Sequence, residues 1–112
     1  MTKKNVLVVI SSLVILFLLG CPQEKKIGQI NQDPQRYVNK DIAVKGTVVN
    51  SFSALVTGAY ELDDGTGTLW VLSNGGVPAK GTRIGVRGNI QTGFSFGGRS
   101  FGTILRERER RY

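Results

Sequence analysis

The chain has 112 residues, of which 15 are basic and 8 are acidic, and it contains one cysteine and no histidine. This composition excludes Ser-His and Cys-His catalytic pairs, zinc sites built on histidine and cysteine, and an intramolecular disulfide. We therefore predict a non-catalytic protein with no metal and no cofactor.

Residues 1–20 have the pattern of a secretory signal peptide. Lys3 and Lys4 form a short basic region, and residues 6–19 are apolar except for two serines. The alternative is a membrane-spanning helix, which needs about 20 apolar residues. The apolar run is shorter than this and is followed by Pro22 and a polar stretch. The pattern therefore favours a cleaved leader over a spanning helix.

The position of the only cysteine extends this prediction. Leu18-Leu19-Gly20-Cys21 resembles the lipobox of bacterial lipoproteins. The resemblance implies cleavage before Cys21 and acylation of its thiol, which removes a free thiol from an oxidising compartment. It also implies a protein of the bacterial cell envelope that is anchored to a membrane by lipid. In a cell with two membranes, Pro22 after the cysteine implies the periplasmic side of the outer membrane.

The mature chain of 92 residues is expected to form one small domain. Loss of Lys3 and Lys4 with the leader leaves thirteen basic and eight acidic residues, a formal charge of +5. A basic excess favours polyanions or anionic membrane surfaces as neighbours. We divide the chain into a signal peptide over 1–20, a lipidated tether over 21–29, a domain over 30–107 and a charged tail over 108–112.

The predicted domain is all β with one short helix. Asp33 and Pro34 favour a helix start, so a short helix is expected over 34–38. From residue 41 apolar and polar residues alternate, which is typical of half-buried strands, and Asp64-Gly65-Thr66-Gly67 indicates a hairpin turn. Strands are predicted over 41–49, 59–63, 68–73, 82–92 and 99–107, with loops over 50–58, 74–81 and 93–98.

Three segments resemble the OB-fold family. They are Lys45-Gly46-Thr47-Val48, the hairpin over 62–71, and the stretch over 78–88 that contains Val86-Arg87-Gly88. The likeness is to the nucleic-acid-binding branch, including tRNA-anticodon-binding and replication-protein-A-like domains. It implies a small five-stranded Greek-key barrel, in which closure removes exposed strand edges. The segment over 73–81 is too short for the helix that many OB folds carry between strands three and four.

Candidate ligand contacts follow from the face that OB folds use for binding, which strands two and three form with the flanking loops. If Leu69 and Val71 face the core, Trp70 points outward onto that face. Aromatic residues that stack bases, beside cations that meet phosphates, are typical of single-stranded nucleic-acid binding. The alternative is that these aromatic residues are additional core. The predicted contacts are Lys45, Phe52, Tyr60, Trp70, Arg87, Phe94, Phe96 and Arg99.

The acidic residues Glu61, Asp63 and Asp64 form the one acidic cluster of the domain. We predict a solvated strand face for Glu61 and Asp63 and a turn cap for Asp64, because turns of this type favour aspartate. A cation site or an acid–base pair is the alternative for the cluster.

These features together predict a membrane-anchored binding module. Its expected ligand is single-stranded nucleic acid, a glycan or another oligomeric polyanion. The alternative is an envelope protein-interaction or structural module, because free nucleic acid is scarce in the envelope. The aromatic and basic residues favour the first hypothesis and the envelope address favours the second.

Overall fold

The computed structural model describes residues 23–54, 57–96 and 98–112. The predicted leader and Cys21 lie outside these residues, and the side chains of Phe96 and Arg99 also lie outside the described set. Within the described ranges, no helix is long and apolar enough to cross a membrane.

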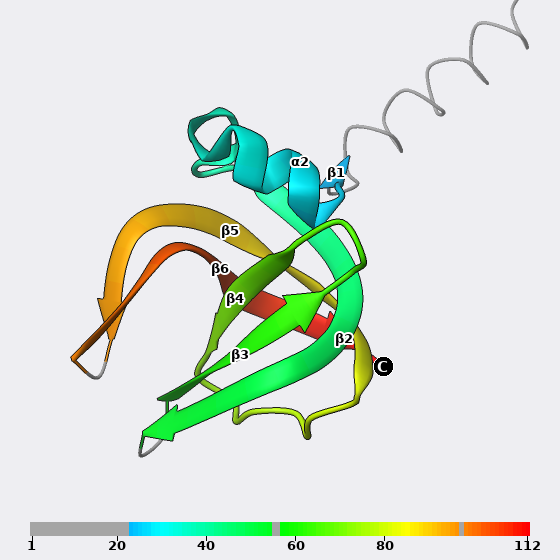
Figure 1. Ribbon diagram of the computed structural model, residues 1–112, viewed down its shortest axis with the longest axis vertical. Helices are drawn as coiled ribbons and strands as arrows, with labels where there is room; N and C mark the ends of the chain where they lie inside the picture. Colours follow the sequence, from blue (N-terminus) through cyan, green and yellow to red (C-terminus); the bar gives the residue numbers. More distant parts are fainter. Residues whose placement is uncertain (1–22, 55–56, 97) are drawn as a thin grey trace, which may run out of the picture.

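Most of the described chain is β-structure, and five long strands close into a ring (Figure 1). β6 runs parallel to β4 and β1 parallel to β2, whereas the other strand pairs are antiparallel. The sheet order is β1-β2-β3-β4-β6-β5, and an additional β2–β5 pairing closes the ring. The predicted all-β ring with little helix is therefore confirmed. The strands are β1 (Gln23–Glu24), β2 (Asp41–Ala54), β3 (Thr57–Asp63), β4 (Thr68–Ser73), β5 (Arg83–Phe96) and β6 (Arg99–Arg111).

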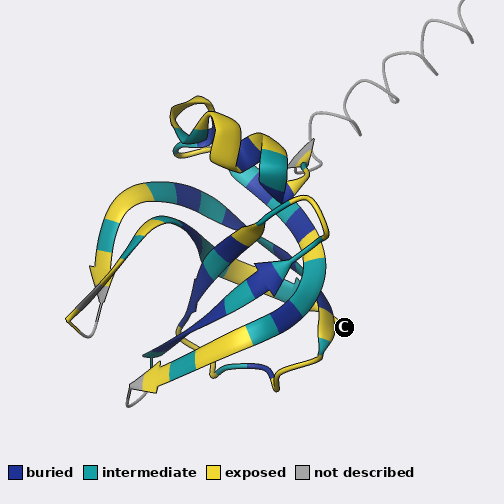
Figure 2. Ribbon diagram, viewed as in Figure 1, coloured by how far each residue is buried: buried dark blue, intermediate teal, exposed yellow. Residues whose placement is uncertain are grey.

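The hydrophobic core lies inside the ring and follows the alternation of the strands. Ile42, Val44 and Val48 of β2 are buried, and Lys45 between them is exposed. Figure 2 shows this alternation as successive buried and exposed bands along the strands. Each fully buried aliphatic side chain contributes about 1.5–3 kcal/mol to folding before the loss of chain entropy. The period of two that predicted the strands therefore also identifies most of the core.

Two glycines within strands permit close backbone approaches. A Cβ atom on Gly88 would lie 2.0 Å from the carbonyl oxygen of Arg106, and one on Gly46 would lie 2.8 Å from that of Asp63. Any side chain at these positions would force neighbouring strands apart. The glycines that the sequence places within the first and fourth predicted strands therefore allow the ring to close tightly.

The N-terminal segment belongs to the domain, and the tether predicted over 21–29 is wrong in its extent. α2 (Ile27–Gln32) buries Ile27 and Ile30, and η1 (Pro34–Tyr37), a 3-10 helix, buries Tyr37. Both elements lie over one opening of the ring (Figure 1). β1 pairs with β2, so the domain includes residue 23 and does not begin at residue 30.

The Asp64 turn holds the start of α2. The Asp64 carboxylate accepts a hydrogen bond from the Ile27 N–H at 2.8 Å, and the Thr66 hydroxyl oxygen accepts one from the Gly28 N–H at 2.9 Å. Burial favours the neutral form of Asp64, but hydrogen bonds from Ile27 and Thr66 outweigh this effect and lower the pKa of the carboxyl. Asp64 thus caps its own turn, as predicted, and also fixes the helix to it.

The loops predicted over 50–58 and 93–98 are wrong, because the flanking strands continue into them. β2 and β3 remain paired as far as Ala54 and Thr57, and β5 and β6 as far as Phe96 and Arg99. Apart from a few large apolar residues such as Phe52 and Phe94, small and polar residues occupy these stretches, so the apolar alternation fades while the backbone pairing persists. We call residues 50–54 and 57–59 the β2–β3 arm, and residues 92–96 and 98–103 the β5–β6 arm.

A β-bulge in β2 changes which residues face outward. The pairing passes from Val48–Leu62 directly to Asn50–Glu61, so Val49 is an extra residue. Strict alternation would place residue 52 on the same side as the buried Val48. The bulge reverses this facing, and Phe52 therefore lies on the outside of the ring.

A second irregularity, in β6, brings charged residues into the ring. The pairing shifts between Gly88–Glu107 and Arg87–Glu109, so that both Glu107 and Arg110 reach inward. The Glu107 carboxylate accepts hydrogen bonds from the Tyr60 hydroxyl, from the Ser73 hydroxyl at 2.9 Å and from Arg110 Nη2 at 2.8 Å. Residues 108–111 of the predicted charged tail belong to β6, which continues to Arg111.

This inward network also fastens the chain between β4 and β5. Arg110 Nη2 donates to the Gly76 carbonyl at 2.8 Å, and its guanidinium lies 5.5 Å from the centre of the Tyr60 ring. The segment that connects β4 to β5 lies on the side of the ring opposite α2 (Figure 1). The segment over 73–81, which is too short for the helix that many OB folds carry there, is held by this polar network.

Candidate functional site

One outward face of the sheet gathers aromatic residues from four strands. Directly paired residues lie on the same face of a sheet, so the strand register defines two rows of neighbours. We call these rows, together with Phe94 and Phe101 of the β5–β6 arm, the aromatic face. The first row is Asn50, Glu61, Trp70, Ile104 and Gln91, and the second is Phe52, Ala59, Leu72, Arg106 and Asn89.

Three rings on this face contact one another. The centre of the Phe101 ring lies 5.0 Å from that of Trp70, edge to face, and 6.2 Å from that of Phe52. Pairs with this geometry contribute about 0.5–1.5 kcal/mol beyond their buried area. Phe52 belongs to the β2–β3 arm and Phe101 to the β5–β6 arm, so the rings join the two arms across β4.

The rings are supported from below and remain half-buried. Trp70, Phe94 and Phe101 pack against a small buried cluster, separate from the main core, formed by Ala59, Leu72 and Ile104. Each ring keeps part of its surface in solvent. The aromatic residues are therefore partly additional core, which was the alternative interpretation, and partly exposed to solvent.

Polar groups flank the rings on both sides. Arg106 lies 5.6 Å from the centre of the Phe94 ring, and its Nε donates to Gln91 Oε1 at 3.4 Å. On the other side of Trp70, the Asn50 amide donates to Glu61 Oε1 at 2.7 Å. Among the described side chains of the aromatic face there is thus one cation and one anion.

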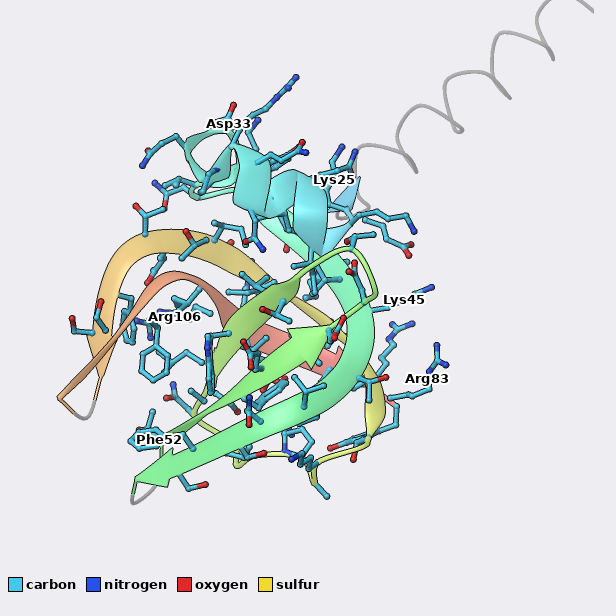
Figure 3. All side chains as sticks on the ribbon, viewed as in Figure 1. Lys25, Asp33, Lys45, Phe52, Arg83 and Arg106 are labelled. Atoms are coloured by element: carbon cyan, nitrogen blue, oxygen red, sulfur yellow. The ribbon has the colours of Figure 1, made fainter. Side chains whose placement is uncertain are left out.

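Two of the predicted cationic contacts lie elsewhere. Lys45 Nζ is 3.3 Å from Glu24, and Arg87 Nη2 is 2.6 Å from Asp41. Figure 3 shows Phe52 and Arg106 on the side of the arms, and Lys45 on the opposite side with Arg83. The hydrogen bond from Arg87 is the main reason that the pKa of Asp41 is lowered.

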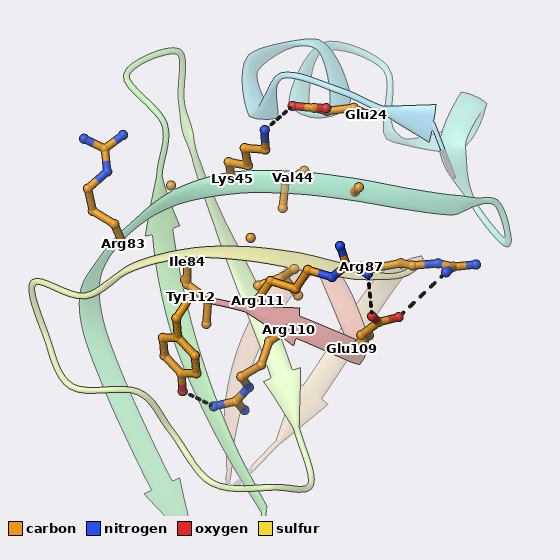
Figure 4. Close-up of a pocket in the computed structure, with 14 residues that line it drawn as sticks. Glu24, Val44, Lys45, Arg83, Ile84, Arg87, Glu109, Arg110, Arg111 and Tyr112 are labelled. Carbon is orange, nitrogen blue, oxygen red and sulfur yellow. Dashed lines mark hydrogen bonds and ion pairs between the residues drawn. The ribbon is translucent and has the colours of Figure 1, made fainter. Parts of the chain in front are cut away.

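Lys45 and Arg87 line a hollow of about 490 Å³ between β2, β5 and the end of β6 (Figure 4). Its other charged residues include Glu24 and Glu109, and Glu109 lies 3.7 Å from Arg87 and 3.5 Å from Arg111. None of the rings of the aromatic face lines this hollow. Five basic and two acidic side chains line the hollow, so it keeps a positive excess, but it lacks the contacting aromatic rings of the aromatic face.

The remaining predicted contacts have different outcomes. Phe52, Trp70 and Phe94 belong to the aromatic face, whereas Tyr60 is fully buried and faces Glu107, which corrects its prediction as a ligand contact. Burial, together with the hydrogen bond to Glu107, raises the pKa of the Tyr60 hydroxyl. Phe96 and Arg99 belong to the β5–β6 arm, and their side chains lie outside the described set.

Sequence reasoning missed Phe101 and Arg106. Arg106 lies near the end of the predicted strand over 99–107, where charged residues of both signs alternate, and the Leu72–Arg106 pairing places it on the aromatic face. Phe101 precedes Gly102, whose φ of 69° breaks the regular strand. The sequence signal that could have identified Phe101 is the presence of an aromatic residue in the last predicted strand. Among the described residues, no group of three or more acidic, cysteine or histidine side chains is arranged to hold a metal ion.

No family model matches the chain, and no curated protein matches it. A similar solved structure is that of a Leishmania major Friedlin protein assigned as an aspartyl-tRNA synthetase, with a TM-score of 0.59 and 11% identity over 81% of this chain and 20% of that one. Another is a replication protein A heterotrimer bound to single-stranded DNA, with a TM-score of 0.49 and 19% identity over 63% of this chain and 55% of that one. The chain thus spans less than two thirds of either protein. The first likeness supports an OB-like fold, in agreement with the sequence motifs.

Proposed function

We propose that this protein binds single-stranded nucleic acid on the aromatic face, with bases stacked on its rings. The observation that carries the proposal is the convergence of Phe52, Trp70 and Phe101 on one outward face between two extended hairpins. Stacking on such rings contributes about 1–3 kcal/mol per base and tolerates any sequence. The proposed role is binding without catalysis.

Arg106 is the phosphate contact in this proposal. Its guanidinium lies beside Phe94 at the edge of the ring cluster, where a backbone phosphate would pass if the bases lie on the rings. One cation among the described side chains of the face implies few released counterions. The expected salt dependence is therefore shallow compared with that of highly basic DNA-binding domains.

The proposed location is the bacterial envelope, with the domain held on a membrane through acylated Cys21, on the periplasmic side of the outer membrane where there are two membranes. Support for this comes from the lipobox-like segment over 18–21 that ends an apolar run. Each buried methylene contributes about 0.8 kcal/mol, so two or three acyl chains make the anchor nearly permanent. The mass of the protein purified from bacterial membranes tests the anchor, and an unmodified mass would contradict it.

Intrinsic fluorescence provides a direct test of nucleic-acid binding, because Trp70 is the only tryptophan of the chain. We expect short single-stranded DNA, titrated into the detergent-solubilised protein at low salt, to quench this fluorescence. Phe101→Ala should weaken binding about tenfold or more through the loss of one stacking surface. Lys45→Gln is the matched control on the opposite side and should bind like the wild type. Absence of binding at low salt would overturn the proposal.

Docking of an envelope protein is a second candidate function. It is favoured by the arrangement of the aromatic face, in which an apolar centre packed on Ala59, Leu72 and Ile104 has a polar rim containing Glu61 and Arg106. Protein interfaces commonly have this anatomy, with few charges at the centre. Crosslinking in intact cells through a photoreactive residue at position 94 distinguishes the two, since a protein adduct and a nucleic-acid adduct differ in nuclease sensitivity.

A further inference from the structure

Glu61 lies beside Trp70 in the polar rim of the proposed binding surface, although a carboxylate repels phosphates. It is directly paired with Trp70 on one side and with Asn50 on the other. Paired residues of neighbouring strands have Cβ atoms about 5 Å apart, so a base stacked on the Trp70 ring has the carboxylate within reach of its edge. The position of Glu61 therefore constrains which part of a nucleic acid can face the sheet.

The hydrogen bond to Asn50 leaves Glu61 with one oxygen for a ligand. Asn50 Nδ2 donates to Glu61 Oε1 at 2.7 Å, which holds the carboxylate in place through one of its two oxygens. An ionised carboxylate only accepts hydrogen bonds. Its natural partners on nucleobases are the exocyclic amino groups of cytosine, adenine and guanine, as in the contact of glutamate with cytosine N4. Thymine and uracil present carbonyl oxygens at the corresponding position.

We infer that Glu61 reads the edge of a stacked base and selects bases that carry an exocyclic amino group. This inference rests on the proposed function and deepens it. It also fixes the orientation of the strand, with the bases turned toward the sheet and the phosphates turned away from Glu61 toward Arg106. The two residues lie in adjacent rows on opposite sides of the Trp70 position, so one nucleotide can meet both.

The test compares oligodeoxycytidine and oligodeoxythymidine of about 12 nucleotides, a length within the range bound by single OB folds. Both are pyrimidine strands with the same backbone, so the ratio of their dissociation constants isolates the base edge. At neutral pH the wild-type protein should prefer the cytidine strand about tenfold, as expected for a hydrogen bond to a charged acceptor. Glu61→Gln should bring the ratio close to one, because an amide both donates and accepts.

Glu109→Gln is the matched control, since it removes one negative charge on the side of the ring away from the aromatic face. It should leave the ratio unchanged even if both strands bind slightly better. Equal binding of the two strands by the wild type, or an unchanged preference in Glu61→Gln, would overturn the inference while the proposed function stands. Failure of both strands to bind would overturn the proposed function together with this inference.

Discussion

Replacement of Arg110 by glutamine tests whether the inward network stabilises the ring. The side chains of Arg110 and Glu107 are only 18% and 11% exposed, and their closest contact is 2.8 Å. Burial of Arg110 disfavours its charged form, but the hydrogen bonds to Glu107 and Tyr112 and the charge of Glu107 together outweigh this effect and raise the pKa of the guanidinium. Removal of Arg110 leaves the Glu107 carboxylate among Tyr60 and Ser73 with no cation beside it.

Breaking a buried ion pair from one side costs about 3–5 kcal/mol, and partial exposure places this pair near the lower end. We therefore expect Arg110→Gln to lower the free energy of unfolding by about 3 kcal/mol, which corresponds to a decrease of about 10–20 °C in melting temperature for a domain of this size. Urea denaturation followed by circular dichroism measures the change.

The neighbouring Arg111 provides the control for this prediction. Its side chain is 86% exposed, and it lies 3.5 Å from Glu109 on the outside of the ring. Arg111→Gln should change stability by less than about 1 kcal/mol, as exposed ion pairs do. Adding Glu107→Gln to Arg110→Gln should restore part of the loss, because it removes the uncompensated charge. Equal effects at positions 110 and 111, or no recovery in the double variant, would refute the reasoning.

Three further predictions concern the turn, the strands and the aromatic face. Because the pKa of Asp64 is lowered in the folded protein, the unfolded chain binds more protons in acid and the free energy of unfolding rises with pH. The contribution of Asp64 is complete above its ordinary pKa of 3.8 and is lost as pH falls through the lower folded value. Asp64→Asn should therefore weaken the pH dependence of the free energy of unfolding measured across this range. Gly88→Ala should destabilise the protein by about 2 kcal/mol or more in the same denaturation assay, because the new Cβ would meet the Arg106 carbonyl, whereas Gly75→Ala, with space around it, should have little effect. Arg106→Gln should reduce the slope of log affinity for single-stranded DNA against log salt by about one, while Arg83→Gln on the opposite side should leave the slope unchanged; equal slopes for Arg106→Gln and the wild type would remove Arg106 as a phosphate contact.

The sequence predicts the ring because the core has a simple period. Ile42, Val44 and Val48 alternate with less buried residues, and the Asp64-Gly65 turn sets the β3–β4 hairpin. The same period predicts that Trp70 faces outward. Where small and polar residues outnumber apolar ones, as in the two arms, the alternation is too weak to predict strands although the backbone remains paired.

Other features depend on irregularities that the pattern does not contain. The bulge at Val49 turns Phe52 outward, and the register shift beside Arg108 turns Arg110 inward. Strict alternation therefore predicts a charged tail over 108–112 and does not reveal the network with Tyr60. The burial of Ile27 was also missed. Two isoleucines in a short polar segment are too few to indicate a helix, and the sequence does not show that the Asp64 turn holds the start of this helix.

β6 contributes adjacent residues to the aromatic face and to the polar network inside the ring. Arg106 lies on the aromatic face, and Glu107 holds the network inside the ring, so the same stretch of backbone serves both. The ring is fixed by pairing on both sides of its strands, whereas the arms depend on hairpin pairing and on the contact between Phe52 and Phe101. Segments with few buried contacts open most easily, so the arms are expected to be the softer part. A ligand held between them should therefore slow hydrogen exchange in the arms much more than in the ring, and the reverse pattern would place the binding site elsewhere.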